Sequence, residues 1–167
     1  MIPRRIMITG AVATGKSTFA SILANKLSLP IIHLDALQRD FDRDKDLAEI
    51  RQRIIDEASK DAWVIDGNAF RKDLDFRIVR ADLVIFFESS PAQSFAKHIF
   101  RHLHHKLTGK QKPGGTSDSL RLNWFIKFIF LDWPKREKEV LQLIELHQKK
   151  LIRIRNRKEA KSLLESI

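Results

Sequence analysis

The residues best suited to chemistry lie at positions 10–17, which read Gly-Ala-Val-Ala-Thr-Gly-Lys-Ser. The segment fits the pattern G-x-x-x-x-G-K-[ST] at every specified position. Gly10 and Gly15 allow backbone angles and a close approach that a side chain would forbid, so the N–H groups of the loop can point inward and hold phosphate at a helix N-terminus. Lys16 can place its charge on the β- and γ-phosphates, and the Ser17 hydroxyl can ligate Mg²⁺. These residues predict a phosphate-binding loop (P-loop) for a nucleoside triphosphate.

A carboxylate further along the chain is a candidate metal ligand. Asp66 ends the apolar run 63–66 and is followed by Gly67. A carboxylate at the carboxyl end of a parallel strand lies in the crevice where ligands bind, so Asp66 can hold Mg²⁺ directly or through water. The alternative is a solvated turn carboxylate before a glycine. The P-loop upstream favours the metal role.

A second acidic residue, Asp35, ends the apolar run 31–34, and Arg39 follows one helical turn later. An acid at this place can orient or deprotonate an acceptor hydroxyl, and Arg39 can bind an acceptor phosphate. A helix-capping Asp and a surface Arg explain the same two residues equally well. Both interpretations stay open at the level of the sequence.

The positive charge of the chain gathers in two stretches that lack acidic residues. The net charge is +10, and the stretch between Glu88 and Asp118 contains five Lys or Arg and four His, whereas 148–158 contains six Lys or Arg. One face of a predicted helix presents His98, Arg101, His102 and His105. A phosphate-facing stripe or a solvated face fits this group better than zinc, because no nearby acid or Cys completes a metal site. A lid that covers phosphates and a nucleic-acid patch both fit the charge.

Short apolar runs alternate with helical patterns along the whole chain. We expect strands at 5–9, 31–34, 63–66, 83–87 and 151–154, and helices at 17–27, 44–59, 91–107, 119–148 and 158–166. This alternation predicts an α/β fold whose parallel sheet is covered on both faces. The aromatic stretch 124–133 is interpreted as a helix packed on the core, in preference to a base-stacking surface. At 167 residues the chain is expected to form one domain, 1–167, with an inserted basic lid near 95–117.

The composition excludes several classes of protein. The chain has no cysteine, so neither a disulfide framework nor a thiolate metal site is possible. Residues 1–30 lack the design of a signal peptide, and no apolar run approaches the length of a membrane span. We therefore expect a cytoplasmic protein without a membrane partner.

Taken together, the motifs resemble those of adenylate-kinase-like P-loop proteins of the DNA topology modulation protein family. The matching segments are 10–17, 33–35, 63–68, Arg77 with Ala81 and Asp82, 109–110 and 155–159. The resemblance implies a nucleotide-kinase-like three-layer fold, with a five-stranded parallel sheet in the order 2-3-1-4-5. It also implies that Asp35, Arg39, Gly67 and Asn68 lie at the acceptor site, that Arg101 belongs to the lid, and that the loop at Asn156 flanks the adenine.

The expected function is ATP-dependent transfer of a phosphoryl group, with ATP and Mg²⁺ bound by the P-loop. The residues expected to bind nucleotide are Gly10, Ala13, Thr14, Gly15, Lys16, Ser17, Thr18 and Asn156. Lys16, Asp35 and Arg101 are the expected catalytic residues, and Ser17 and Asp66 the expected metal ligands. The favoured acceptor is a small molecule such as a nucleoside or a nucleoside monophosphate.

Two alternatives to this function remain. The net charge of +10 motivates a nucleic-acid-associated ATPase or polynucleotide kinase, although nucleic acid is the less favoured partner. A nucleotide-binding module with negligible turnover is motivated by the lid, where His and Lys lack the planar, permanently charged fork of Arg.

Overall fold

The computed structural model describes residues 2–37, 47–68, 74–108 and 122–167, of which 47, 74–75, 101–108 and 122–124 are described by their backbone alone. The strands are β1 (Arg5–Gly10), β2 (Ile31–His33), β3 (Trp63–Asp66), β4 (Leu83–Phe87) and β5 (Leu151–Ile154). The helices are α1 (Lys16–Leu27), α2 (Leu34–Leu37), α3 (Leu47–Ser59), α4 (Leu74–Arg80), α5 (Pro91–Thr108), α6 (Leu122–Lys127), α7 (Trp133–Leu146) and α8 (Arg157–Ser166). A π-helical segment, η2 (Phe128–Asp132), joins α6 to α7.

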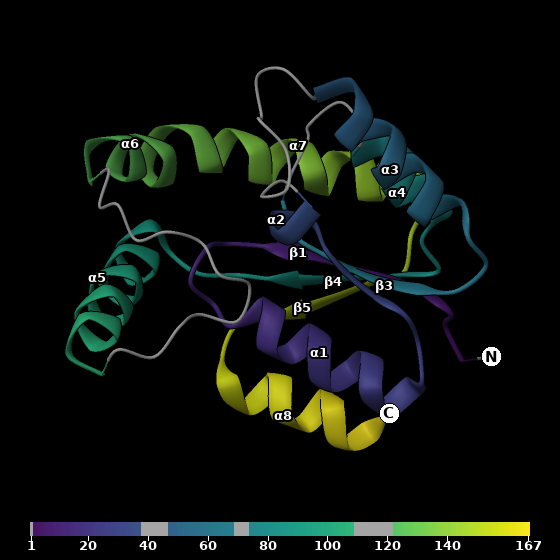
Figure 1. Ribbon diagram of the computed structural model, residues 1–167, viewed down its shortest axis with the longest axis horizontal. Helices are drawn as coiled ribbons and strands as arrows, with labels where there is room; N and C mark the ends of the chain where they lie inside the picture. Colours follow the sequence, from purple (N-terminus) through teal and green to yellow (C-terminus); the bar gives the residue numbers. More distant parts are fainter. Residues whose placement is uncertain (1, 38–46, 69–73, 109–121) are drawn as a thin grey trace.

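The five strands form one parallel sheet in the order β2-β3-β1-β4-β5. The carboxyl ends of the strands point to the left in Figure 1, towards α5, while α1 and α8 lie below the sheet and α3, α4 and α7 above it. A sheet covered on both faces explains why the strands read as continuous apolar runs. The predicted α/β class and strand order are both confirmed.

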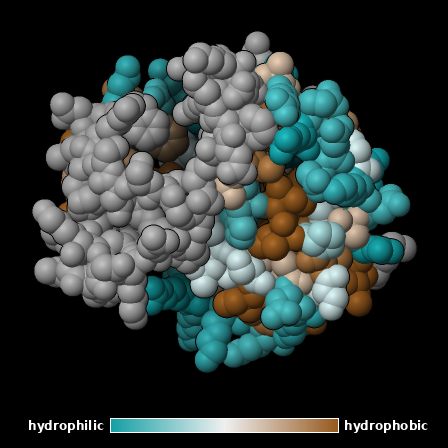
Figure 2. Space-filling model, viewed as in Figure 1, coloured by the Kyte–Doolittle hydropathy of each residue, from teal (hydrophilic) through white to brown (hydrophobic). Residues whose placement is uncertain are grey.

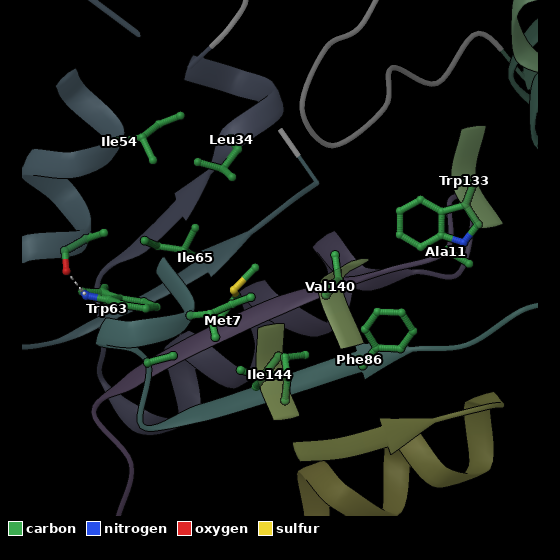
Figure 3. Close-up of a cluster of buried hydrophobic side chains, with 14 of the residues drawn as sticks. Met7, Ala11, Leu34, Ile54, Trp63, Ile65, Phe86, Trp133, Val140 and Ile144 are labelled. Atoms are coloured by element: carbon green, nitrogen blue, oxygen red, sulfur yellow. Dashed lines mark hydrogen bonds between the residues drawn. The ribbon is translucent and has the colours of Figure 1, made fainter. Parts of the chain in front are cut away.

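Alternate side chains of the strands supply two separate cores. On one face, Met7, Ile65 and Phe86 pack with α3, α4 and α7; on the other, Ile6 and Ile85 pack with α1 and α8. Figure 3 shows part of the first core, in which Trp63 donates a hydrogen bond of 3.1 Å from Nε1 to the carbonyl oxygen of Ala58. The aromatic stretch joins the same core, since Phe125, Phe128, Ile129 and Trp133 are all buried. The core interpretation is therefore confirmed for these four residues, whereas Ile126, Phe130 and Leu131 of the same stretch are exposed.

Helix α3 shows how the sequence pattern sets the side that faces the sheet. Ile50, Ile54 and Ala58 are fully buried, at a spacing of four residues that places them on one helical face. The opposite face is exposed to solvent, and the surface over α3 is accordingly hydrophilic in Figure 2. No helix in the described part of the chain is both long and apolar enough to cross a membrane.

Three elements differ from those expected. Strand β2 ends at His33, so Asp35 lies in the short helix α2 and does not end the strand. Helix α4 was not expected, because seven residues make only two turns and leave little periodicity to detect. The helix expected at 119–148 is interrupted by η2, in which Trp133 N–H donates to the carbonyl oxygen of Phe128 five residues earlier.

An ion pair at the start of the sheet gives the first testable prediction. Asp82 accepts hydrogen bonds from the backbone N–H groups of Arg4 and Arg5 and from the Arg5 guanidinium, the shortest at 2.6 Å. Burial raises the pKa of Asp82, but these hydrogen bonds outweigh burial and hold the pKa below its ordinary value. Because the folded-state pKa is depressed, the stabilisation is present above the unfolded-state pKa and is lost as pH falls through the folded value.

Asp82→Asn is therefore expected to lower the free energy of unfolding by about 1 to 2 kcal/mol at neutral pH, after discounting for solvent screening. The difference from the parent protein should shrink as the pH falls below 4. Urea titrations at several pH values measure both effects, with the exposed Glu145→Gln as the matched control. A difference that is independent of pH would contradict the assigned ion pair.

Candidate active site

The loop between β1 and α1 has the backbone that the motif requires. Gly10 and Gly15 have φ angles of 125° and 91°, and Ala13 also lies in the left-handed region at 59°. A Cβ atom on Gly10 would lie 2.2 Å from the carbonyl oxygen of Phe87 in β4, so no side chain fits there. The next N–H group, that of Ala11, donates to the same oxygen at 2.8 Å. Steric exclusion by β4 thus explains why residue 10 is glycine, and the positive φ angle explains why residue 15 is glycine.

The open end of α1 is the expected place for phosphate. The helix begins at Lys16, and no side chain in the described part of the protein caps it, which leaves N–H groups of its first turn as donors for an anion. The Lys16 ammonium and the Thr14 hydroxyl both donate to the carbonyl oxygen of Ala11. These contacts hold the Lys16 charge against the loop itself. Phosphate binding by Ala13, Thr14, Gly15, Ser17 and Thr18 remains a prediction.

Asp66 is brought beside this loop and is almost completely buried, with 3% of its surface exposed. The parallel pairing of β2 and β3 sets Asp66 opposite His33, whose Nδ1 lies 3.0 Å from Asp66 Oδ2. This hydrogen bond raises the pKa of His33 above its ordinary value, although burial opposes the shift. The buried position shows that the alternative of a solvated turn carboxylate is wrong.

His33 also connects Asp66 to the first helix. Its Nε2 lies 3.4 Å from the Ser21 hydroxyl, which donates to the carbonyl oxygen of Ser17 at 3.0 Å. The Ser21 and His33 side chains therefore connect Asp66 to the backbone carbonyl of Ser17, whose hydroxyl is the expected Mg²⁺ ligand. The sequence matched His33 only as part of a motif. The predicted strand order was the one signal that could have set its side chain beside Asp66.

The donor set near Asp66 fits Mg²⁺. Asp66 Oδ1 is buried and has no hydrogen-bond partner in the part of the chain described. An unpaired buried carboxylate oxygen is costly unless a cation or water satisfies it. Mg²⁺ typically uses one or two protein carboxylates together with phosphate oxygens and water, which agrees with one Asp and one Ser. Within the described residues, no group of three His, Cys, Asp or Glu side chains could hold a metal by itself.

The expected acceptor residues are only partly brought together. Asp35 is exposed in the first turn of α2, so both interpretations of it stay open. Gly67 has a φ of 131°, and a Cβ atom there would lie 3.0 Å from Leu34. The amide of Asn68 is bonded to Thr9 and Gly10, at the start of the P-loop. Arg39 lies outside the described residues.

Arg77 of α4 is fully buried and lies beside Gly67. Its guanidinium is 3.4 Å from the carbonyl oxygen of Gly67, to which it donates. A buried guanidinium that bonds the peptide after Asp66 helps to fix where β3 ends. At the level of the sequence, Arg77 had no role beyond its place in the resemblance.

The lid and the adenine loop remain predictions. Arg101 lies in α5, but its side chain is outside the described residues, as is the whole of 109–121. The His98 ring stacks on Phe125, with ring centroids 3.5 Å apart. Asn156 Oδ1 accepts a hydrogen bond from Glu159 N–H and Asn156 Nδ2 donates to the Glu159 carboxylate, so the Asn156 side chain caps the start of α8. A helix cap therefore already uses this side chain.

The three-layer architecture, the strand order and the loop geometry define a P-loop fold of the nucleotide-kinase type. No protein-family model matches the chain, and no curated protein matches it. Solved structures match over nearly the full length. A shikimate kinase from Bacteroides thetaiotaomicron aligns with a TM-score of 0.60 at 20% identity, covering 99% of this chain and 96% of that one.

Two further neighbours have different substrates in their names. A gluconokinase from Sinorhizobium meliloti aligns with a TM-score of 0.52 at 16% identity, covering 98% of this chain and 93% of that one. A deoxyadenosine kinase from M. mycoides, solved with bound dATP, aligns with a TM-score of 0.51 at 12% identity, covering 98% of both chains. At these identities the similarity establishes the fold.

Proposed function

We propose that the chain is an Mg²⁺-dependent phosphotransferase that moves the γ-phosphoryl group of ATP to the hydroxyl of a small acceptor. The observation that supports this most directly is the meeting of three features at one edge of the sheet. These are the start of α1 and the buried Oδ1 of Asp66, both without a side-chain partner among the described residues, and the Lys16 ammonium on the P-loop. A site for polyphosphate and Mg²⁺ needs all three.

In the proposed reaction an acceptor hydroxyl oxygen bonds to the γ-phosphorus of ATP while the bond to the β–γ bridging oxygen breaks and ADP leaves. The P-loop N–H groups and Lys16 bind the phosphates and stabilise negative charge in the transition state. Ser17 and Asp66 would hold Mg²⁺, which supplies further charge neutralisation when bound. Asp35 orients the acceptor hydroxyl and receives its proton. Arg101 contributes a positive charge from the lid.

The acceptor is proposed to be a small molecule, with a nucleoside or nucleoside monophosphate as the favoured class. All three neighbours described above are named as kinases of small hydroxyl-bearing compounds, and one of them is a deoxyadenosine kinase. The sequence contains no Asn/Thr-Lys-x-Asp segment of the kind that reads guanine, which favours ATP as the donor. We place the enzyme in the cytoplasm.

A phosphotransfer screen tests the proposal. Labelled ATP and Mg²⁺ are incubated with the protein and pools of metabolites, nucleosides and short oligonucleotides, with Lys16→Ala run in parallel. Label transferred to a small molecule by the parent protein alone supports the proposal. Label on an oligonucleotide end supports the polynucleotide kinase instead, and ATP binding without transfer to any pool supports a nucleotide-binding module.

The Mg²⁺ site gives a separate prediction. Asp66→Asn should leave ATP binding in EDTA unchanged, but reduce the gain in ATP affinity on adding Mg²⁺ by roughly tenfold, because the amide loses the charge that favours the ion. Calorimetric titrations with and without Mg²⁺ measure this gain, with the exposed Asp61→Asn as control. Equal responses of the Asp66 variant and the parent protein would make Asp66 structural.

A further inference from the structure

The side chain of Asn68 continues a backbone ladder beyond the end of a strand. The pairing of β1 with β3 ends at Ile8 and Asp66, after which Gly67 N–H donates to the carbonyl oxygen of Ile8 at 3.1 Å. The chain then turns away at Gly67, whose φ is 131°. Asn68 Oδ1 accepts from Gly10 N–H at 3.2 Å, and its Nδ2 donates to the carbonyl oxygen of Gly10 at 2.7 Å. The amide thus makes the two bonds to Gly10 that the backbone of two successive odd-numbered positions of a continued β3 would have shared.

The orientation of this amide is fixed by a second donor. The hydroxyl of Thr9, a residue with 1% of its surface exposed, donates to Asn68 Oδ1 at 2.8 Å. Exchanging the oxygen and nitrogen of the amide would set NH₂ against the Gly10 N–H group. Both ends of the amide are therefore occupied by the protein itself.

Gly10 is held on its other side by β4. It pairs with Phe87 in the parallel ladder, and the following residue, Ala11, donates its N–H to the Phe87 carbonyl oxygen. The first peptide of the P-loop thus lies between Phe87 and Asn68, and neither contact comes from the loop. Such fixation from outside orients the loop N–H groups before phosphate arrives, which lowers the ordering cost of binding.

We infer that Asn68 is a positioning residue of the nucleotide loop, in place of the acceptor contact that the resemblance implies. This inference rests on the proposed function, because it requires that the loop binds ATP. The positioning role and the acceptor-contact role differ in the ligand whose affinity they affect. A positioning residue affects the affinity for ATP alone, whereas an acceptor contact leaves the affinity for ATP unchanged.

The test measures ATP dissociation constants by calorimetry in EDTA, where neither Mg²⁺ nor the acceptor takes part. Asn68→Ala removes all three hydrogen bonds and is expected to weaken ATP binding roughly tenfold. Asn68→Asp keeps the accepted bonds but sets a negative oxygen against the Gly10 carbonyl and near the phosphates, so its loss should be larger. The exposed Asn25→Ala is the matched control and should bind as the parent does.

A double-mutant cycle with Thr9→Val tests the same contact from its other end. If the Thr9 hydroxyl acts through Asn68, the loss in the double variant should be smaller than the sum of the single losses. Thr9→Val also replaces Asn68→Ala if that variant does not fold, because it removes one hydrogen bond without changing the side-chain volume much.

Four outcomes are distinct. Circular dichroism melts identify a purely structural role, in which Asn68→Ala melts earlier but binds ATP with the parent affinity at a temperature where both are folded. That result overturns the inference, and so do additive losses in the cycle. Failure of the parent protein to bind ATP overturns the proposed function, whereas weakening by Lys16→Ala but not by Asn68→Ala or Asn68→Asp overturns only the role of Asn68.

Discussion

Lys16→Ala is expected to weaken ATP binding roughly a hundredfold and to remove phosphotransfer, because a charge-assisted contact with the phosphates is lost. Lys16 is only half-buried, and its ammonium donates to the carbonyl oxygen of Ala11 in its own loop. We therefore expect Lys16 to act through its charge and not through packing, and the fold should survive the substitution. Calorimetry measures the affinity, and thermal melts measure the stability.

The exposed Lys127→Ala provides the matched control, since it removes the same charge from a position on α6. Its ATP affinity should equal that of the parent protein. If Lys16→Ala bound ATP as tightly as the parent protein does, the proposed function would be wrong, because it depends on the Lys16 charge at the phosphates.

Gly10→Ala is expected to have the largest effect on stability. The added Cβ would lie 2.2 Å from the carbonyl oxygen of Phe87 and 2.5 Å from its nitrogen, at a φ of 125°. Both contacts are with the backbone of β4, which cannot move without breaking its ladder with β1. Overpacking and backbone strain together predict a loss of about 4 kcal/mol in the free energy of unfolding.

Gly15→Ala separates the steric cost from the conformational cost. Gly15 also has a positive φ, 91°, but no atom of the described residues lies within 4 Å of the Cβ position. Only strain is expected there, at about 1 to 2 kcal/mol. Chemical denaturation measures both variants. Equal losses would mean that the backbone of β4 relaxes around the added methyl group without cost.

The fold could be predicted because its signals are local. Each strand is a short, mostly apolar run that ends at or just before a polar or glycine residue, and the strands predicted at 63–66, 83–87 and 151–154 have the observed bounds. The presence of a P-loop could be predicted for the same reason, since its motif consists of eight consecutive residues. The strand order came from a resemblance to other proteins, because the pattern of one sequence does not say which parallel strands are neighbours.

Much of the site depends on contacts between distant residues, which no local pattern contains. Asn68 and Gly10 are 58 positions apart, and His33 and Asp66 are 33 apart. The position of Asp66 at a strand end and the resemblance that includes Asn68 indicated functional roles for these residues but did not reveal their partners. The identity of the acceptor could not be predicted from the fold. The three neighbours share this fold but are named for three different substrates, so the fold alone does not identify the acceptor.

The central place of β1 has a consequence for biosynthesis. β1 is the first strand to leave the ribosome, yet its sheet partners are β3 and β4, which are made 53 to 82 residues later. Strand β1 therefore cannot pair with β3 or β4 until the intervening segment has been synthesised. Pairing between strands that are far apart in the sequence is also slow. Gly10 needs Asn68 on one side and Phe87 on the other. A nascent chain that extends past Ser17 but ends before Phe87 thus contains the complete P-loop motif but is not expected to form the P-loop.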